Sequence, residues 1–174
     1  MSSGNTVLLF VYPPSGSNSD IRTFRGYQLS AGSSTSTELY RFHHPLTGLS
    51  SGVTTFQHRN LTTGIWDTAG HIDWTSNSNA TVTFGLDQVN IRDLRRAKKT
   101  TSQSRRFKAK GSEYKWKIAE NESDLFCVDA RGRTVATWRQ SALTLSVVAG
   151  VEDILDYIVV TCLLHLWVRQ SGRW

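Results

Sequence analysis

The chain has 174 residues, 39% of them apolar and 20% charged, and its net charge is +6 at pH 7. This length and composition favour one domain with a hydrophobic core, and they exclude a disordered chain, a coiled coil and a small disulfide-stabilised secreted protein. The two cysteines, Cys127 and Cys162, lie in apolar runs and favour a reducing compartment. No basic segment precedes the first apolar run, so we expect no signal peptide and a cytoplasmic location.

β-Strands separated by turn residues are predicted for most of the sequence up to residue 90. Apolar runs and alternating apolar and polar residues indicate these strands, because successive side chains of a strand point to opposite faces. The pair Ala69–Gly70 predicts a hairpin turn between a strand over 65–67 and its return over 71–74. The other strands predicted here are Val7–Tyr12, Phe24–Leu29, Glu38–His43, Val53–Arg59 and Thr81–Leu86.

Positive charge is concentrated in residues 92–117, which carry eleven basic and two acidic side chains, a charge of +9, whereas the other 148 residues carry −3. Phe107 is the only large apolar residue in 95–111, so we expect an exposed, flexible basic loop over about 92–110. Such a cluster favours an anionic partner; the alternative is a solvated loop without a ligand. The candidate anion-binding residues are Arg95, Arg96, Lys98, Lys99, Arg105, Arg106, Lys108, Lys110, Lys115 and Lys117.

The remaining third of the chain is predicted to contain further strands and one helix. Strands are expected over 113–118, 125–128, 134–138 and 143–148. Residues 151–169 begin with acidic side chains and end at Arg169, a polarity that favours a helix. Only Thr161 and His165 are polar between residues 157 and 168, and this apolar stretch is shorter than the ~20 residues that a membrane span needs. We therefore expect the helix to be buried, with the strands enclosing it.

Several segments together resemble a known family. They are Leu39-Tyr40-Arg41, Thr54-Thr55-Phe56, Gly111-Ser-Glu-Tyr-Lys-Trp-Lys117, Val135-Ala136 before a Trp–Arg pair, and Ile154-Leu155-Asp156 followed by Ile158-Val-Val-Thr161. Over roughly residues 38–169 they are similar to a fungal, mushroom-type family of unknown function, DUF6593. The resemblance implies kinship with tubby-like and scramblase-like barrels, and no activity is assigned to the family. We expect residues 1–174 to form a single mainly-β domain, a tubby-like closed β-barrel of short antiparallel strands around a buried hydrophobic C-terminal helix.

Three functions fit these features. The first is binding of RNA or ribosomes through the basic residues, which in a fungal protein includes a ribosome-inactivating toxin that acts as an rRNA N-glycosylase. The second is a tubby-like module that binds anionic phospholipids with the same residues. The third is a non-catalytic regulatory protein. No cofactor or metal is expected, because the sequence has no glycine-rich phosphate loop, no Cys-x-x-Cys and no histidine pair at metal-binding spacing. The sequence does not indicate an oligomeric state.

An N-glycosylase needs a carboxylate beside the ribose, a cation for the leaving base and aromatic rings that hold it. Residues of these kinds occur together at Glu113 and Tyr114, and again at Tyr40 and Arg41. The alternative places Tyr114 in the core and Glu113 on the surface. Other histidines and tryptophans have possible roles as well. We expect His43 and His44 at the surface or in a turn, and His165 in the core. Trp116 and Trp138 are expected to fill the core, whereas Trp66, Trp74 and Trp174 are available for stacking or membrane contact.

Overall fold

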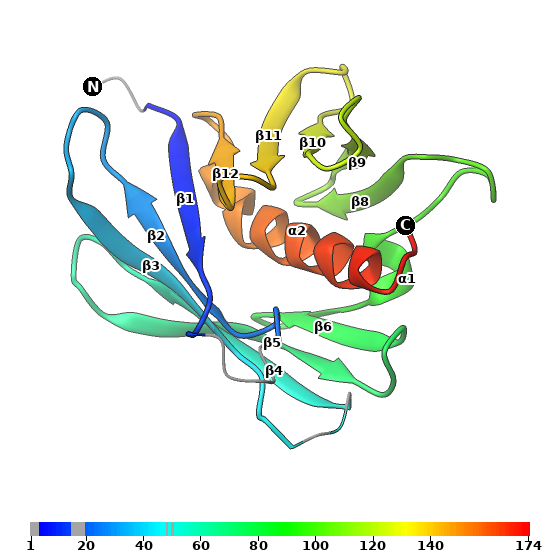
Figure 1. Cartoon of the computed structure of the whole chain (residues 1–174), viewed down its shortest axis with the longest axis horizontal. Helices are drawn as coiled ribbons and strands as arrows, with labels where there is room; N and C mark the ends of the chain where they lie inside the picture. Colours follow the sequence, from blue (N-terminus) through cyan, green and yellow to red (C-terminus); the bar gives the residue numbers. More distant parts are fainter. Residues whose placement is uncertain (1–3, 15–19, 48, 50) are drawn as a thin grey trace.

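The structure, a computed structural model, describes residues 4–14, 20–47, 49 and 51–174. A twelve-stranded antiparallel sheet curves around a C-terminal helix (Figure 1). The helical elements are α1 (Ile91–Leu94), the 3-10 turn η1 (Glu152–Ile154) and α2 (Leu155–Gln170). The strands are β1 (Thr6–Val11), β2 (Phe24–Leu29), β3 (Ser36–His43), β4 (Gly52–Arg59), β5 (Trp66–Trp74), β6 (Ala80–Phe84), β7 (Asp87–Asn90), β8 (Arg105–Ala109), β9 (Ser112–Ile118), β10 (Leu125–Val128), β11 (Thr134–Arg139) and β12 (Thr144–Val147).

The strand order is β7-β6-β5-β4-β3-β2-β1-β12-β11-β10-β9-β8, so strands that follow one another in the chain pair, except β7 and β8, and β1 also pairs with β12. β7 and β8 form the two edges, and no pairing between them occurs in the described part of the chain. α1 follows β7 and contacts both edge strands. The mainly-β architecture is confirmed, but the pairings describe a curved sheet with two edges, whereas the sequence predicted a closed barrel.

Helix α2 is the centre of the core, as its composition predicted. Eleven of the twelve residues from Leu155 to Leu166 are buried. Thr161 is a completely buried polar residue of the helix; its Oγ1 accepts a hydrogen bond from Trp116 Nε1 at 2.8 Å and donates to the Tyr157 carbonyl at 2.7 Å. Its polar group is therefore satisfied inside an apolar environment. None of the helices in the described ranges has the length and apolar character that a membrane crossing requires.

A stack of phenylalanine rings ties four neighbouring strands together on the inner face of the sheet. Ring centroids are 4.3 Å apart between Phe10 and Phe24, 4.6 Å between Phe24 and Phe42, and 5.1 Å between Phe42 and Phe56. Cross-strand aromatic pairs of this kind add to the stability that burial alone provides. The predicted core positions of Trp116 and Trp138 are confirmed, but Trp74 is also buried, at 2% exposure, and is not available for ligand contact.

The predicted hairpin at Ala69–Gly70 is wrong, because β5 runs without interruption from Trp66 to Trp74. Gly70 lies where the β4–β5 register shifts by one residue. A Cβ atom at this position would lie 1.9 Å from the Thr83 carbonyl oxygen and 2.5 Å from Cζ of Phe56. The glycine therefore permits a close approach between strands and does not mark a turn.

The predicted basic loop over 92–110 is also corrected, because both of its ends are structured. Asn90 caps α1 by accepting a hydrogen bond from the Arg92 backbone N–H at 2.9 Å, and Leu94 is buried. At the other end, β8 pairs with β9 and buries Phe107 and Ala109. Residues 106–109 alternate between charged and apolar side chains, which allows the strand to bury one face and leave these charges on the other. The connecting segment is reduced to residues 95–104.

Candidate functional site

Basic side chains gather on the outer surface of β8 and β9. In the register of this hairpin Arg106 is opposite Lys115, and Phe107, which faces the core, is opposite Tyr114. The segment before β8 is held beside it by two backbone hydrogen bonds between Arg96 and Arg106, at 2.9 and 2.7 Å. The outward residues Arg96, Lys98, Arg106, Lys108, Lys115 and Lys117 are named here the basic face.

Two neighbouring clefts lie on the basic face. One, of about 270 Å³, is lined by Arg96, Ala97, Lys98, Arg106, Phe107, Lys108 and Glu113. The other, of about 320 Å³, is lined by Arg106, Glu113, Tyr114, Lys115, Asp129, Ala130 and Gly132. The clefts share Arg106 and Glu113, whose side chains form an ion pair at 3.0 Å. Because both partners are about one-third exposed or more, this pair contributes little stability and Arg106 can exchange Glu113 for another anion.

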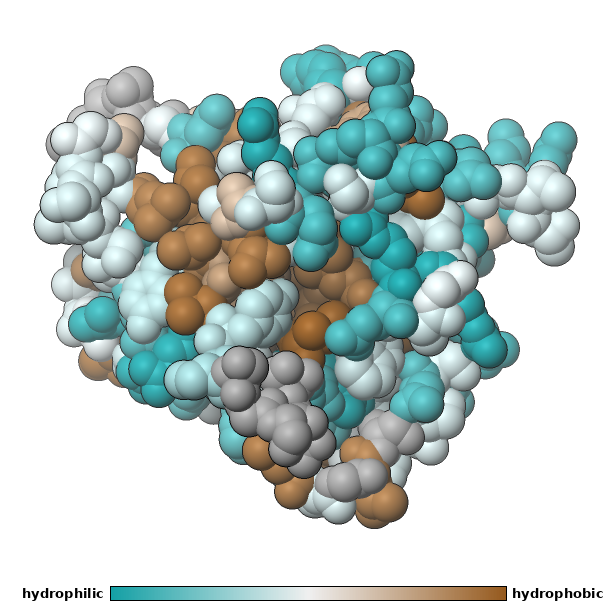
Figure 2. Space-filling model, in the orientation of Figure 1, coloured by the Kyte–Doolittle hydropathy of each residue, from teal (hydrophilic) through white to brown (hydrophobic). Residues whose placement is uncertain are grey.

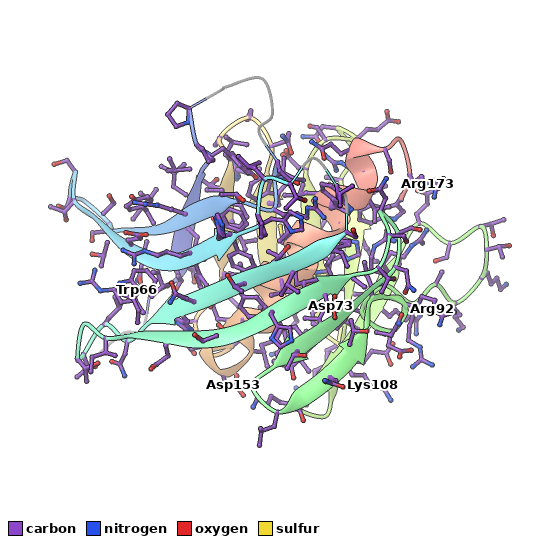
Figure 3. All side chains as sticks on the ribbon, turned by 90° about the horizontal axis from the view of Figure 1, so that it is seen from below. Trp66, Asp73, Arg92, Lys108, Asp153 and Arg173 are labelled. Carbon is purple, nitrogen blue, oxygen red and sulfur yellow. The ribbon has the colours of Figure 1, made fainter. Side chains whose placement is uncertain are left out.

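The figures show the setting of the basic face. Hydrophilic residues cover the part of the molecule that contains β9, β10, β11 and the segment 95–104 (Figure 2). The Lys108 side chain extends outward from the ribbon (Figure 3). Lys99 lies in the segment 95–104 and Lys110 in the turn between β8 and β9, and both are exposed. Eight of the ten predicted anion-binding residues are therefore accessible from outside the sheet.

Arg95 and Arg105, the other two predicted anion-binding residues, point away from the basic face. Arg105 is opposite Trp116 in the register, and its guanidinium donates to the backbone carbonyls of Ser102 and Ser104 at 2.7 and 3.1 Å. Arg95 Nε donates to His165 Nδ1 at 3.0 Å. Burial, together with the nearby charge of Arg105, lowers the pKa of Arg95 to about 10. These two arginines therefore belong to a separate environment near the end of α2.

The four predicted catalytic residues lie in two pairs on different strands. Tyr40 and Arg41 lie on β3, whereas Glu113 and Tyr114 lie on β9, with five strands between them in the sheet. Arg41 points outward, where it pairs with Glu38 at 2.7 Å and stacks on the Trp66 ring at 4.1 Å. The two predicted pairs therefore lie at separate places in the sheet.

Tyr40 instead takes part in a polar network that the sequence analysis missed. Its hydroxyl donates to Asp156 Oδ1 at 2.5 Å, and the same oxygen lies 2.9 Å from His58 Nδ1. The Tyr40 and His58 rings stack at 4.6 Å. Burial, and secondarily the Asp156 carboxylate, holds the pKa of Tyr40 well above its usual value. The signal that could have found this network is the β3–β4 register, which places Tyr40 opposite His58.

A pocket of about 620 Å³ opens beside this network. Its lining residues are Thr6, Gln28, Leu39, His58, Arg59, Asn60, Leu61, Asp67, Ala69, Glu152, Leu155 and Asp156. The three carboxylates in this lining outnumber its single arginine, so the pocket disfavours phosphate groups. It is not part of the surface that could bind a polyanion.

The remaining predicted positions are mostly buried. His43 is exposed, but His44 is 1% exposed and not a surface residue; its Nδ1 lies 2.8 Å from Thr54 Oγ1, which also accepts from Trp74 Nε1 at 3.0 Å. His165 is buried, as predicted, and the two cysteines of the apolar runs, Cys127 and Cys162, are buried as well. Trp66 and Trp174 are partly exposed.

Comparison with known proteins gives one match. A family model described as "Family of unknown function (DUF6593)" matches residues 25–171, a range that includes the basic face, the Tyr40 network and all of α2. No curated protein and no solved structure shows significant similarity to the chain. Because the match covers most of the sequence and contains the segments that suggested it, the chain belongs to the DUF6593 family.

Proposed function

We propose that this protein binds RNA through its basic face. The observation that carries the proposal is the cleft of about 270 Å³ in which Arg96, Lys98, Arg106 and Lys108 surround one space with Glu113 as the single acid. Lysine and arginine side chains in this arrangement bind backbone phosphates and release counterions, which supplies affinity without sequence specificity. Glu113 is already paired with Arg106, so the net charge that a polyanion meets in the cleft is strongly positive.

RNA fits the basic face better than a membrane surface does. No large apolar side chain is exposed among residues 92–117, all of which the structure describes, so this surface has no group that would insert into lipid. Tyr114 lies opposite Phe107 and stacks on that ring at 5.5 Å, so it belongs to the inner side of the hairpin and the basic face is formed by charged side chains. Charged side chains without an apolar anchor suit contacts with backbone phosphates.

The proposal is a binding function and does not include base excision. Glu113 and Tyr114 remain beside the clefts, but the second half of the predicted catalytic set lies five strands away on β3. Tyr40 is buried and Arg41 is paired with Glu38, so neither can meet a base bound at the basic face.

The proposal also includes kinship with tubby-like barrels and a cytoplasmic location in a fungal cell. The twelve antiparallel strands that curve around a buried C-terminal helix support the suggested kinship with tubby-like barrels. In that view α1 covers the gap between β7 and β8, where a closed barrel would pair its edge strands. A cytoplasmic location in a fungal cell would give the protein access to ribosomal RNA.

The test is a comparison of two fourfold variants in fluorescence anisotropy with a single-stranded RNA. The first replaces Arg96, Lys98, Arg106 and Lys108 with Gln. The second, a control with the same change in net charge, replaces the exposed Arg25, Arg133, Arg139 and Arg173 with Gln. We expect the first variant to lose most of the affinity and the control to retain it.

Two results would contradict the proposal. One is equal loss of affinity in the two variants, which would indicate a non-specific effect of net charge. The other is binding of the parent protein to anionic liposomes but not to RNA under the same salt conditions, which would assign the basic face to phospholipid.

A further inference from the structure

A second group of cations surrounds His165 near the C-terminal end of α2. The chain end lies beside α1 and β8 there (Figure 1). The Trp174 ring is 4.9 Å from the His165 ring, and the guanidinium groups of Arg95 and Arg105 lie 6.0 and 5.9 Å from the Trp174 ring. Arg169 follows His165 by one helical turn and therefore lies on the same side of α2. Arg95, Arg105, His165, Arg169 and Trp174 are named here the His165 cluster.

The hydrogen bond from Arg95 fixes the protonation of His165. A guanidinium has donors only, so His165 Nδ1 must be the accepting, unprotonated nitrogen of a neutral ring. The proton of the neutral ring is then on Nε2, which makes Nε2 a donor. Burial of His165 and the charges of Arg95, Arg105 and Arg169 hold its pKa well below the usual value, which agrees with a neutral ring. His165 is completely buried, and Nε2 has no hydrogen-bond partner in the described part of the chain.

Two further hydrogen-bond donors of the His165 cluster, one on Arg95 and one on Arg169, also lack an acceptor among the described residues. Arg95 Nη2 and Arg169 Nη1 are buried and have no partner among the described residues, although Arg169 Nη2 donates to the Ser123 carbonyl. Within the described ranges, none of the three arginines forms an ion pair with an Asp or Glu side chain, and Arg105 Nη2 donates to the main-chain oxygen of Trp174 at 2.5 Å. All three unpartnered groups are donors, and the arginines carry three positive charges. Buried donors of this kind need an acceptor, and beside three arginines a negatively charged acceptor is favoured.

We propose that the His165 cluster binds a small oxyanion, either free phosphate or the phosphate of a nucleotide. Oxygen atoms of the anion accept hydrogen bonds from the unpartnered donors, and its charge offsets that of the arginines. Arg95, Arg105, Arg169 and Trp174 are each partly exposed, so solvent reaches the cluster. The site is independent of the basic face, because Arg105 and Arg106 point to opposite sides of β8.

The experiment measures thermal unfolding with inorganic phosphate, with a nucleoside monophosphate and with chloride, all at the same ionic strength. At about ten times its Kd a ligand that binds only the folded protein raises Tm by roughly 3–6 °C for a chain of this size. We expect this shift in Tm with inorganic phosphate or with the nucleotide. A shift with inorganic phosphate would identify the ligand as a free anion, and a shift with the nucleotide alone would identify it as the phosphate of a nucleotide. Chloride should give no comparable shift. Equal shifts with all three salts would overturn the proposal.

Neighbouring arginines provide a matched pair of variants. Arg95→Gln removes a donor and a charge from the cluster, whereas Arg96→Gln makes the same change on the basic face. We expect Arg95→Gln to abolish the phosphate shift but retain RNA binding, and Arg96→Gln to retain the phosphate shift. A phosphate shift that survives in Arg95→Gln would contradict the proposal. If Arg95→Gln does not fold, the parent protein still provides the test: phosphate should change tryptophan fluorescence, and the change should disappear in Trp174→Phe.

Discussion

Truncation of a single leucine in α2 measures how much of the stability depends on the buried helix. Leu163 is completely buried near the middle of the helix, with buried residues on both sides of it in the chain. Leu163→Ala removes the transfer free energy of the lost methyl groups and leaves a cavity, which together cost roughly 2.7–5.0 kcal/mol in comparable cores. For a chain of this length each kcal/mol lowers Tm by roughly 2–4 °C, so the expected decrease is roughly 5–20 °C.

The assay is thermal unfolding followed by far-UV circular dichroism, with Leu61→Ala as the control. Leu61 lies in the loop between β4 and β5 and is 50% exposed, so its truncation should change the free energy of unfolding by no more than about 0.5 kcal/mol. Equal Tm values for Leu163→Ala and the parent protein would refute the position of α2 in the core.

Three further predictions concern other buried groups. Below pH ~6.5 the unfolded chain binds a proton at His165 that the folded protein does not. The free energy of unfolding should therefore decrease as the pH is lowered, by up to ~1.4 kcal/mol per pH unit. Urea unfolding between pH 7.5 and 5.5 should show a smaller decrease in His165→Gln. Gly70→Ala should cost roughly 1–3 kcal/mol, because its Cβ would overlap the Thr83 carbonyl; an unchanged urea midpoint would disprove that contact. Cys127 and Cys162 should resist iodoacetamide until the protein unfolds, because they are buried and burial raises the pKa of both thiols; mass spectrometry of the native protein should show no adduct.

The sequence predicted the local elements better than their arrangement. The apolar composition of residues 157–168 was sufficient to predict a buried helix, because no amphipathic surface helix has so few polar residues. Strand pairing is a long-range property, and no local pattern showed that β1 joins the two halves of the sheet. Gly70 was misinterpreted for a related reason. A glycine in a turn and a glycine under a neighbouring backbone have the same sequence signal, and only the packing against Thr83 distinguishes them.

The candidate sites show the same limit. The charge cluster was visible from composition, but which arginine faces outward depends on a single step of the strand alternation. Arg105 lies on the inner side of β8 and Arg106 on the outer side, so a one-residue uncertainty in the strand would reverse them. The contact of Tyr40 with His58 required the β3–β4 register, and the contact with Asp156 required the position of α2 relative to β3. Neither can be derived from residue types alone.

The salt dependence of RNA binding tests the central claim most directly. If the basic face neutralises backbone phosphates, the logarithm of the affinity falls linearly with the logarithm of the salt concentration, by roughly 0.7 for each phosphate on a single strand. Replacing Arg96, Lys98, Arg106 and Lys108 with Gln should therefore reduce the slope by about three units, whereas the control variant with four other arginines replaced should keep the slope of the parent protein. Equal slopes for the parent protein and the basic-face variant would contradict the account.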